Sequence, residues 1–286
     1  MAIRDGQVIH IERGEEWEQK AMLGMLKDYV QYLPDMDLAF NIHDEPRVII
    51  PHVQLAHMVN VATTRTMPAA FASKEPRNAF SARPSDMNNG HRIEEYFFTR
   101  FNRVAQQPTW THSRLSCPPD TPAMSIDESP PDNSTAYALG DLGFVYNHTA
   151  FTDICMYPSL RDNYGFFAAP NAFNIVQDLV PIFSQSKISS FQDILYPSPW
   201  YWLEKTKYDE KRDRDWDKKQ EKLYWRGSTT GGYSRHGGWR RQHRQRFVRE
   251  INALGEAKVL ANVDGQWQTE TKSRPEYKDM FDVTFS

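Results

Sequence analysis

The stretch from Leu223 to Val248, LYWRGSTTGGYSRHGGWRRQHRQRFV, constrains the fold more than any other part of this sequence. It begins with a strand-like apolar segment and continues through a loop of small residues. Large, mostly apolar side chains then recur at every fourth position from Trp239 to Ile251, which predicts a helix from about Gly237 to Leu254. A strand, a loop and a helix in succession favour the α/β class, in which sheets and helices pack in layers.

The same stretch has the chemistry of a phosphate-binding loop. Free N–H groups and the dipole at a helix N-terminus attract anions. Ser228 and Thr229 add hydroxyl groups, and Arg226 and Arg244 add planar guanidinium groups that bind phosphate in a bidentate way. A solvated basic helix after an ordinary glycine turn explains the composition equally well. RNA binding is a third interpretation, but the net charge of −3 counts against it.

The rest of the sequence alternates helix-like and strand-like segments, which again favours α/β layers. Residues 15–32 carry apolar side chains at helical spacing and predict a helix. Further strands are predicted at residues 38–42, 138–146, 179–186, 258–263 and 282–286.

Composition divides the chain into two predicted domains. Residues 1–204 form the first, with an insertion rich in Pro, Asn, Ser and Asp at about 67–135. Residues 205–222 are a charged, solvated linker, and residues 223–286 begin the second domain. This second part is short against the roughly 100–200 residues of a typical domain and ends in a strand-like segment without a continuation. We therefore expect the second domain to be incomplete in this chain.

Asp44 is the candidate general base. Pro46 ends the predicted strand at 38–42 and leaves His43, Asp44 and Glu45 at its C-terminal tip. Ligands bind at the C-terminal ends of strands in open α/β sheets, and a carboxylate there can accept a proton. A turn aspartate that caps the following segment is the alternative, and the local pattern alone favours it.

Several other kinds of site are not indicated. The histidines have no metal-ligand spacing, and the two D-x-D tripeptides lie in a connection and in a charged run. No G-x-S-x-G motif is present. The aromatic segment YPSPWYW, from Tyr196 to Trp202, could stack against a sugar, but clusters of this kind usually belong to a core.

Cysteine usage and targeting signals carry little information here. Cys117 and Cys155 form no C-x-x-C pair, so they are either one disulfide or two buried thiols. The first residues have no apolar signal region, and no run of about 18 apolar residues exists to span a membrane. Sequons occur at Asn133 and Asn147, and such tripeptides are common by chance.

Three segments occur in order and at plausible spacings: LPDMDLAFNIHDEP, FSQSKISSFQDILYPSPWYW and LYWRGSTTGG…HRQRFV. Together they resemble glycosyltransferase family 90, which includes fungal capsule-associated xylosyltransferase-type proteins and animal protein O-glucosyltransferases. The resemblance covers about Gly14 to Leu254 and is similar in detail to the fungal branch. It implies a GT-B architecture of two Rossmann-like domains with the active site between them. It also implies transfer of xylose or glucose from a UDP donor to an acceptor hydroxyl, with inversion and without a metal or other cofactor.

The resemblance also implies roles for individual residues. Asp44 matches the catalytic base, which takes the proton of the acceptor hydroxyl. Ser228 matches the serine that contacts the UDP diphosphate, and Arg244 matches the arginine that neutralises the leaving phosphate. Arg226 and Thr229 fall in the same donor loop.

A second matching segment adds two residues. Ser186 and Lys187 match the F-S-x-S-K segment that lines the cleft with the donor. The partners implied are a UDP-sugar and a glycan or protein hydroxyl, with no nucleic acid and no membrane segment in this chain.

The sequence departs from the family at both ends. Family members have an N-terminal anchor or signal and a longer C-terminal part that completes the UDP pocket, so we expect weak or no activity of this fragment. The family's place in the lumen of the secretory pathway implies a Cys117–Cys155 disulfide and glycans on Asn133 and Asn147 in a full-length relative. The alternative function is a non-catalytic remnant that binds carbohydrate or protein.

Overall fold

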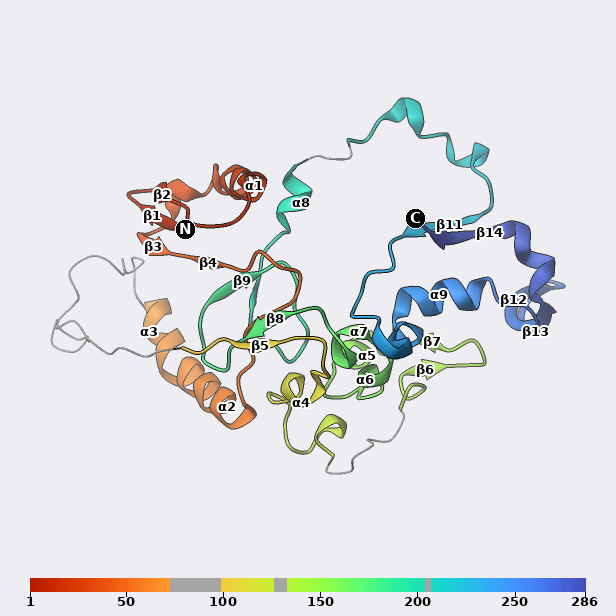
Figure 1. Cartoon of the computed structure of the whole chain (residues 1–286), viewed down its shortest axis with the longest axis horizontal. Coiled ribbons are helices and arrows are strands. Elements are labelled where there is room, and N and C mark those ends of the chain that lie inside the picture. Colours follow the sequence, from red (N-terminus) through yellow and green to blue (C-terminus); the bar gives the residue numbers. More distant parts are fainter. Residues whose placement is uncertain (73–98, 126–132, 204–206) are drawn as a thin grey trace. The chain divides into compact units, whose positions relative to one another are not determined.

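The computed structural model describes residues 1–72, 99–125, 133–203 and 207–286. Contacts divide the chain into two units. Unit 1 is Met1–Arg103 with Asn174–Lys207, and unit 2 is Val104–Phe173 with Tyr208–Ser286. Both units contain helices and strands, so the predicted mixed α/β class is confirmed (Figure 1).

The two units group residues by their contacts, and the predicted domains stay a prediction. The chain leaves unit 1 after Lys207, within the segment 205–222 that we predict as a linker. Val104–Phe173 groups by its contacts with unit 2, whereas the predicted first domain includes it. Within the predicted insertion at 67–135, residues 73–98 and 126–132 lie outside the described residues.

Unit 1 consists of short elements. Its helices and helical turns are α1 (Glu16–Leu26), η1 (Val30–Tyr32), α2 (His52–Val61), η2 (Ala62–Thr66), α3 (Met67–Ala72) and α8 (Pro199–Trp202). Its strands are β1 (Ala2–Arg4), β2 (Gln7–His10), β3 (Met36–Asp37), β4 (Ala39–Phe40), β9 (Ile182–Ser184) and β10 (Ile194–Leu195). The chain passes between the units within β5 (Asn102–Val104) and at β8 (Phe173–Ile175).

The strands of unit 1 form two three-stranded sheets. One is antiparallel, in the order β2-β1-β3, and the other is parallel, in the order β10-β9-β4. In the parallel sheet Ala39 pairs with Ile182, and Phe183 pairs with Ile194. The segments that follow β4 and β9 therefore leave the sheet at the same edge, as expected for parallel strands.

The apolar core of unit 1 forms beside this parallel sheet. It gathers Val48, Ile50, Val176 and Ile182, and the partly buried Leu55, Met58 and Val180 pack against them. Backbone hydrogen bonds join the same segments, from the Ile49 N–H to the Val176 carbonyl at 2.9 Å and from the Val176 N–H to the Arg47 carbonyl at 2.8 Å. We call the segment Arg47–Ile50 the core strip. The helix α2 begins shortly after it, at His52, and contributes the packed side chains of Leu55 and Met58.

One buried carboxylate connects the core strip to the sheet. Asp193 is only 2% exposed. It accepts hydrogen bonds from the backbone N–H groups of Arg47 and Val48, both at 2.8 Å, and from the Ser184 hydroxyl at 2.6 Å. Three donors compensate the cost of removing this charge from water.

Two predictions for unit 1 need correction. The predicted helix at 15–32 ends at Leu26, because its apolar stripe does not continue into the core: Tyr29 is 64% exposed. Without packing, a helix of this size gains little from further turns. The aromatic segment of α8 is not core either, since Trp200 and Tyr201 are 51% and 82% exposed. It packs on α1, where Trp200 contacts Trp17 and Trp202 contacts Gly24.

Unit 2 has helices, helical turns and strands in a longer succession. The helices and turns are α4 (Trp110–Ser113), η4 (Pro122–Met124), α5 (His148–Thr152), α6 (Leu160–Asn163), α7 (Gly165–Ala168), η5 (Glu210–Arg212), η6 (Trp216–Lys218), η7 (Arg235–Arg241), α9 (His243–Ile251) and η8 (Arg274–Met280). The strands are β6 (Ala138–Leu139), β7 (Phe144–Val145), β11 (Leu223–Gly227), β12 (Glu256–Val263), β13 (Gln266–Ser273) and β14 (Phe281–Phe285).

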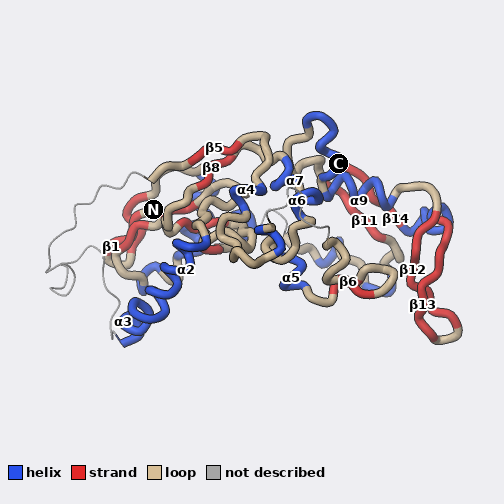
Figure 2. Tube along the Cα trace, turned by 90° about the horizontal axis from the view of Figure 1, so that it is seen from below, coloured by secondary structure: helices blue, strands red, loops and turns tan. Residues whose placement is uncertain are grey.

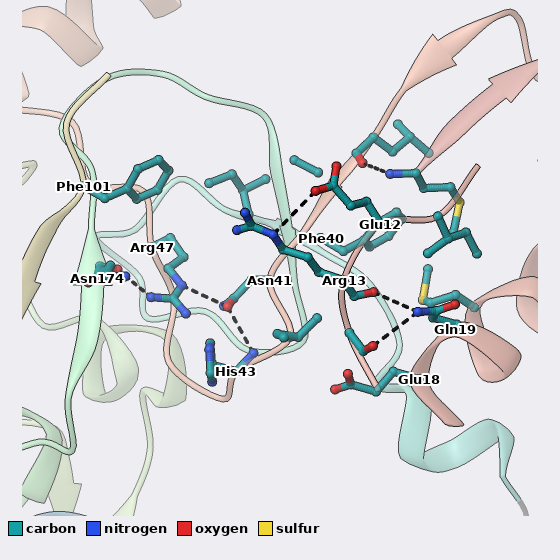
Figure 3. Close-up of a pocket in the computed structure, with 18 residues that line it drawn as sticks. Glu12, Arg13, Glu18, Gln19, Phe40, Asn41, His43, Arg47, Phe101 and Asn174 are labelled. Atoms are coloured by element: carbon teal, nitrogen blue, oxygen red, sulfur yellow. Dashed lines mark hydrogen bonds and ion pairs between the residues drawn. The ribbon is translucent and has the colours of Figure 1, made fainter. Parts of the chain in front are cut away.

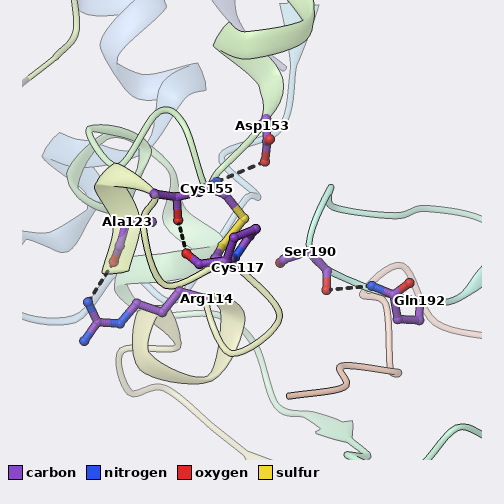
Figure 4. Close-up of a disulfide and its surroundings, with 9 residues drawn as sticks. Arg114, Cys117, Ala123, Asp153, Cys155, Ser190 and Gln192 are labelled. Carbon is purple, nitrogen blue, oxygen red and sulfur yellow. Dashed lines mark hydrogen bonds between the residues drawn. A yellow bond between two sulfur atoms is a disulfide. The ribbon is translucent and has the colours of Figure 1, made fainter. Parts of the chain in front are cut away.

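A disulfide holds the first part of unit 2. Cys117 and Cys155 are bonded across a sequence separation of 38, and both are buried. The Cys155 carbonyl accepts a hydrogen bond from the Ala123 N–H at 3.1 Å, and Arg114 donates to the Ala123 carbonyl at 2.8 Å (Figure 4). A cross-link over a loop of this length stabilises the folded state by about 3–4 kcal/mol, chiefly by restricting the unfolded chain.

The second part of unit 2 is built on two parallel strands and a helix. β11 pairs with β14 from Leu223–Phe281 to Gly227–Phe285, so the strands predicted there are confirmed. The Trp225 ring lies edge-on to Phe247 of α9 at 5.6 Å and to Phe285 at 5.9 Å. The indole thus joins helix and sheet.

Two predicted elements of unit 2 are wrong in extent. The helix expected from Gly237 begins only at His243, because the residues before it form the 3-10 turn η7 up to Arg241 and Gln242 is extended, with φ of −74° and ψ of 135°. The strand expected at 138–146 is a hairpin of β6 and β7, turned at Gly140 and Gly143, both with positive φ.

The strand expected at 258–263 is correct and is part of a longer hairpin. β12 pairs antiparallel with β13 over eight residue pairs (Figure 2). Asp264 and Gly265 form the two-residue turn with φ of 51° and 86°. An Asp-Gly pair favours this turn because both positions need positive φ.

We predict that Asp193→Ala removes the hydrogen bonds that connect the core strip to β9 and destabilises this region. A buried donor without an acceptor costs roughly 1–3 kcal/mol, so the loss of three acceptor contacts should destabilise this region by about 3 kcal/mol or more. Hydrogen–deuterium exchange should show lost protection at the Arg47 and Val48 amides. Asp178→Ala, at an exposed position, is the control and should leave both amides protected. Unchanged exchange in Asp193→Ala would contradict the role of this carboxylate.

Candidate functional site

The loop after β11 is the first candidate site, and close glycine packing holds it in place. Gly231 and Gly232 have φ of 120° and 146°, which side-chain-bearing residues rarely adopt. The Tyr233 N–H donates to the Ala169 carbonyl at 2.6 Å. A Cβ atom on Gly165 would overlap the Gly231 carbonyl. The loop therefore rests on α7, and this contact tolerates only glycine.

Arg244 joins this loop to the first turn of α9. Its Nη1 donates to the Ser228 carbonyl at 3.1 Å, to the Ser228 hydroxyl at 3.2 Å and to the Thr230 hydroxyl at 3.0 Å. The two hydroxyl groups are 3.0 Å apart. Among the described residues, no acceptor pairs with the Nε or Nη2 of Arg244. The structure thus brings together Ser228 and Arg244, and these two nitrogens keep donors for an added anion.

Thr229 has a different position from its neighbours. Its carbonyl accepts from Gln245 Nε2 at 2.9 Å, and the same nitrogen donates to Gln242 Oε1 at 2.7 Å. Both glutamines are buried. This pair supports the loop from beneath, and sequence reasoning missed it because amides on a basic helix normally face solvent.

Arg226 is committed to an ion pair. Its Nη2 lies 2.6 Å from Asp282 Oδ1, its Nη1 donates to the Asp282 carbonyl at 2.8 Å, and its guanidinium lies 4.5 Å from the centre of the Tyr224 ring. These contacts connect β11 to β14. Arg226 therefore has a structural function in the sheet, while the expected contact with a diphosphate would require this pair to open.

A small cavity adjoins Arg244. It has a volume of about 380 Å³ and is lined by Trp225, Arg226, Gly227, His243, Arg244 and Phe247. Burial lowers the pKa of His243, and the charges of Arg244 and Arg246 lower it further. Both effects favour the neutral form of His243, and the fixed positive charges at this cavity are those of Arg226 and Arg244.

Asp44 lies in the second candidate site, in unit 1, on the segment that follows β4. Its side chain is exposed. Gln185 Nε2 donates to Asp44 Oδ1 at 3.0 Å, and the Ser186 hydroxyl donates to the Asp44 carbonyl. Ser186 therefore meets Asp44 at the shared edge of the parallel sheet.

Two residues that sequence reasoning missed orient this aspartate. Gln185 is itself held by the Ser198 hydroxyl, which donates to its Oε1 at 2.6 Å. Asn41 shapes the segment, since its Nδ2 donates to the Glu45 carbonyl at 2.7 Å and its Oδ1 accepts from the His43 N–H at 3.1 Å (Figure 3). The sequence could have indicated both residues by position, since Gln185 directly precedes Ser186 and Asn41 lies three positions before Asp44 in the quoted segments.

Lys187 has no such partner. Its side chain is exposed and forms no hydrogen bond or ion pair with the residues that the structure describes. Within the same residues, no group of three or more His, Cys, Asp or Glu side chains has a geometry that could hold a metal ion. None of the described helices combines the length and the hydropathy needed to cross a bilayer.

The two sequons are placed differently, which generates a prediction. Asn133 uses both side-chain atoms, donating to the Met156 carbonyl at 2.8 Å and accepting from Ser159 at 3.0 Å. Asn147 is exposed and caps α5 with its oxygen, at 3.1 Å from the Ala150 N–H, while its Nδ2 has no partner among the described residues.

A glycan attaches to this nitrogen, so in a eukaryotic secretory host we expect a glycan on Asn147 and none on Asn133. Asn147→Gln should abolish the glycosidase-sensitive mass, and Asn133→Gln, the matched control, should retain it. A folded, secreted chain with a glycan on Asn133 would contradict the prediction.

Comparisons with known proteins add no relative to these two sites: no protein-family model, no curated protein and no solved structure matches this chain.

Proposed function

We propose that this protein is a UDP-sugar-dependent glycosyltransferase that transfers a sugar to an acceptor hydroxyl with inversion. One observation carries the proposal: Arg244, in the first turn of α9, is fixed against the Ser228 and Thr230 hydroxyls of a glycine-rich loop. Hydroxyls, backbone N–H groups and an arginine with unused donors are the groups that bind a diphosphate. The sequence resemblance to glycosyltransferase family 90 selects a UDP-sugar among diphosphate ligands.

Unit 2 would hold the donor. Arg244 would bind the phosphate oxygens through Nε and Nη2, and the hydroxyls of Ser228 and Thr230 would donate to the same group. As the bond between the anomeric carbon and the phosphate oxygen breaks, negative charge grows on the diphosphate. A fixed guanidinium stabilises that charge without reorganising, which is the effect that accelerates such reactions most.

Unit 1 would supply the base. Asp44 would take the proton of the acceptor hydroxyl while the oxygen forms its bond to the anomeric carbon and UDP leaves. Gln185, held by Ser198, keeps the Asp44 carboxylate in one orientation through a hydrogen bond of 3.0 Å. Ser186 fixes the backbone of the same residue. Such positioning matters because proton transfer requires the base within hydrogen-bond distance of the hydroxyl.

The proposal extends to architecture and location. Parallel strand pairs in both units support a GT-B-type arrangement of two Rossmann-like domains. The Cys117–Cys155 disulfide supports a protein of the secretory pathway, because disulfides persist in oxidising compartments. The acceptor would be a hydroxyl of a glycan or a protein.

Calorimetry with UDP tests donor binding. Arg244→Met should weaken binding by about 10–100-fold, because a hydrogen bond to a charged group contributes roughly 1.5–3 kcal/mol. Ser228→Ala should weaken it by less than about tenfold. Arg249→Met is the matched control, since Arg249 lies near the other end of α9 and pairs with Glu250 at 2.8 Å; it should leave UDP affinity unchanged.

Other outcomes would point to other functions. Absence of UDP binding, with retained glycan binding, would replace the proposal by a non-catalytic carbohydrate-binding protein. An equal decrease in UDP affinity in Arg244→Met and Arg249→Met would indicate non-specific attraction of UDP to a basic helix. RNA binding with a steep salt dependence would identify the helix as a nucleic-acid contact.

Asp44→Asn tests the base separately. The variant should bind UDP as the unaltered protein does but transfer sugar about 10²–10⁴-fold more slowly, the usual contribution of a general base. The measurement is release of UDP in the presence of acceptor. Glu45→Gln is the control at the neighbouring position and should retain most of the activity. A similar rate loss in both variants would argue for a general charge effect and against a role of Asp44 in proton transfer.

A further inference from the structure

Unit 1 contains a second cavity that the proposed reaction does not use. It has a volume of about 630 Å³, in the range of small-molecule sites. We call it the Arg47 pocket; its walls include Phe40, Asn41, Arg47, Phe101, Asn174 and Ile182 (Figure 3). The pocket lies beside the segment that carries His43.

Arg47 is the unusual group in this pocket, because it is only 8% exposed and has no ion-pair partner among the described residues. Its Nε donates to Asn41 Oδ1 at 2.9 Å, and its Nη1 donates to the Asn174 carbonyl at 3.1 Å. No described residue accepts from Nη2, which points to the side of the pocket where His43 lies (Figure 3).

Neutral acceptors compensate a buried guanidinium only in part. Removing such a charge from water costs several kcal/mol, and hydrogen bonds to an amide and a carbonyl return less than a carboxylate does. Desolvation lowers the pKa of Arg47, although the charges of Glu45 and Asp193 act in the opposite direction. The Asp193 carboxylate is occupied with the Arg47 and Val48 N–H groups and with Ser184.

A purely structural role explains two of the three nitrogens. Through Nε and Nη1 the guanidinium ties the segment after β4 to β8. Methionine or lysine could not form both bonds, so a structural role alone is a sufficient reason for an arginine. It does not explain why the third nitrogen is left inside a cavity of this size.

The remaining charges on the pocket wall limit the charge of a ligand. Arg13 Nε lies 3.7 Å from Glu12 Oε1, so the charges of these two side chains offset each other. Glu18 accepts from the Glu15 N–H at 2.8 Å and stays near the start of α1. Among the described lining residues, Arg47 and the N-terminal ammonium group of Met1 have no ion-pair partner, and the Met1 ammonium donates to the Leu38 carbonyl at 2.9 Å. The cations Met1, Arg13 and Arg47 against the anions Glu12 and Glu18 leave one net positive charge, with His43 counted as neutral. Glu12 and Glu18 disfavour a second negative charge on the ligand, so a monoanion fits this field better than a phosphate dianion.

We propose that the Arg47 pocket binds a small carboxylate-bearing ligand, with the carboxylate on Nη2 of Arg47 and the rest of the molecule between the Phe40 and Phe101 side chains. This binding does not depend on the proposed sugar transfer, since all the residues lie in unit 1. A carboxylate gives the buried guanidinium the charge-assisted partner that the protein itself does not supply.

Calorimetry on the full chain with a matched pair of probes tests the charge requirement. Glucuronate and glucuronamide have the same shape and differ in charge. Glucuronate should bind at least about tenfold more tightly, as expected when a hydrogen bond to a charged group is lost. N-acetylglycine, a carboxylate without a sugar ring, identifies the source: binding equal to that of glucuronate indicates a general carboxylate, and weaker binding indicates a sugar acid.

Substitution tests the residue. Arg47→Met should reduce glucuronate binding to the level of glucuronamide. Arg13→Met, at the exposed rim of the same pocket, is the matched control and should change it by less than about threefold. If Arg47→Met does not fold, the affinities of the unaltered protein for glucuronate and glucuronamide still test whether the pocket requires a negative charge on its ligand.

Three results would overturn the proposal. The first is equal affinity for glucuronate and glucuronamide. The second is no binding of either carboxylate at concentrations up to about 10 mM. The third is tighter binding of glucose 6-phosphate than of glucuronate, which would assign the pocket to a phosphate. None of these depends on UDP binding, so the donor loop and this pocket succeed or fail separately.

Discussion

The hydrogen bonds of Asp193 are the interaction on which unit 1 depends. This buried carboxylate holds the backbone of Arg47 and Val48 and the hydroxyl of Ser184. Ser184 in turn receives a hydrogen bond from Asn41 at 3.1 Å, and Asn41 accepts from Arg47. A single charge, compensated by donors from two distant segments, therefore fixes the whole stretch from Asn41 to Val48. A buried network of this kind favours one arrangement, because alternatives leave more polar groups unpaired; within the described residues, Nη2 of Arg47 is the donor of this network that stays without an acceptor.

The same stretch supplies both proposed sites of unit 1. Asp44 is exposed and oriented by Gln185, whereas Arg47, three positions later, is buried and faces the pocket. The segment turns between these two residues, and Asn41 holds the turn through the Glu45 carbonyl and the His43 N–H. A proposed base has to be exposed to reach an acceptor hydroxyl. A proposed carboxylate-binding arginine benefits from burial, because an ionic hydrogen bond is stronger away from water.

Unit 2 stabilises its loop by different means. The Gly165–Gly231 contact admits no side chain, and the buried Gln242–Gln245 pair supports Thr229 from below. The disulfide restrains the segment that contains Ile154 and Tyr157, both part of the buried core. Rigid support suits a loop proposed to hold a diphosphate, because donors that are already in position bind an anion without a cost of ordering. Arg244 then combines two functions: Nη1 maintains the loop, and its other nitrogens remain for a ligand.

Strong local patterns predicted strands at 179–186, at the start of the segment Leu223–Val248 and at 258–263, which correspond to β9, β11 and β12, and they placed Asp44 beyond a strand end. The contacts of the side chains could not be predicted in this way. Gln185 reaches Asp44 across 141 positions, Asp193 reaches Arg47 across 146, and Arg226 finds Asp282 instead of remaining available to a ligand. The reason is physical: periodicity records which way a residue faces, whereas the partner of a polar side chain is set by chain segments that only folding brings together.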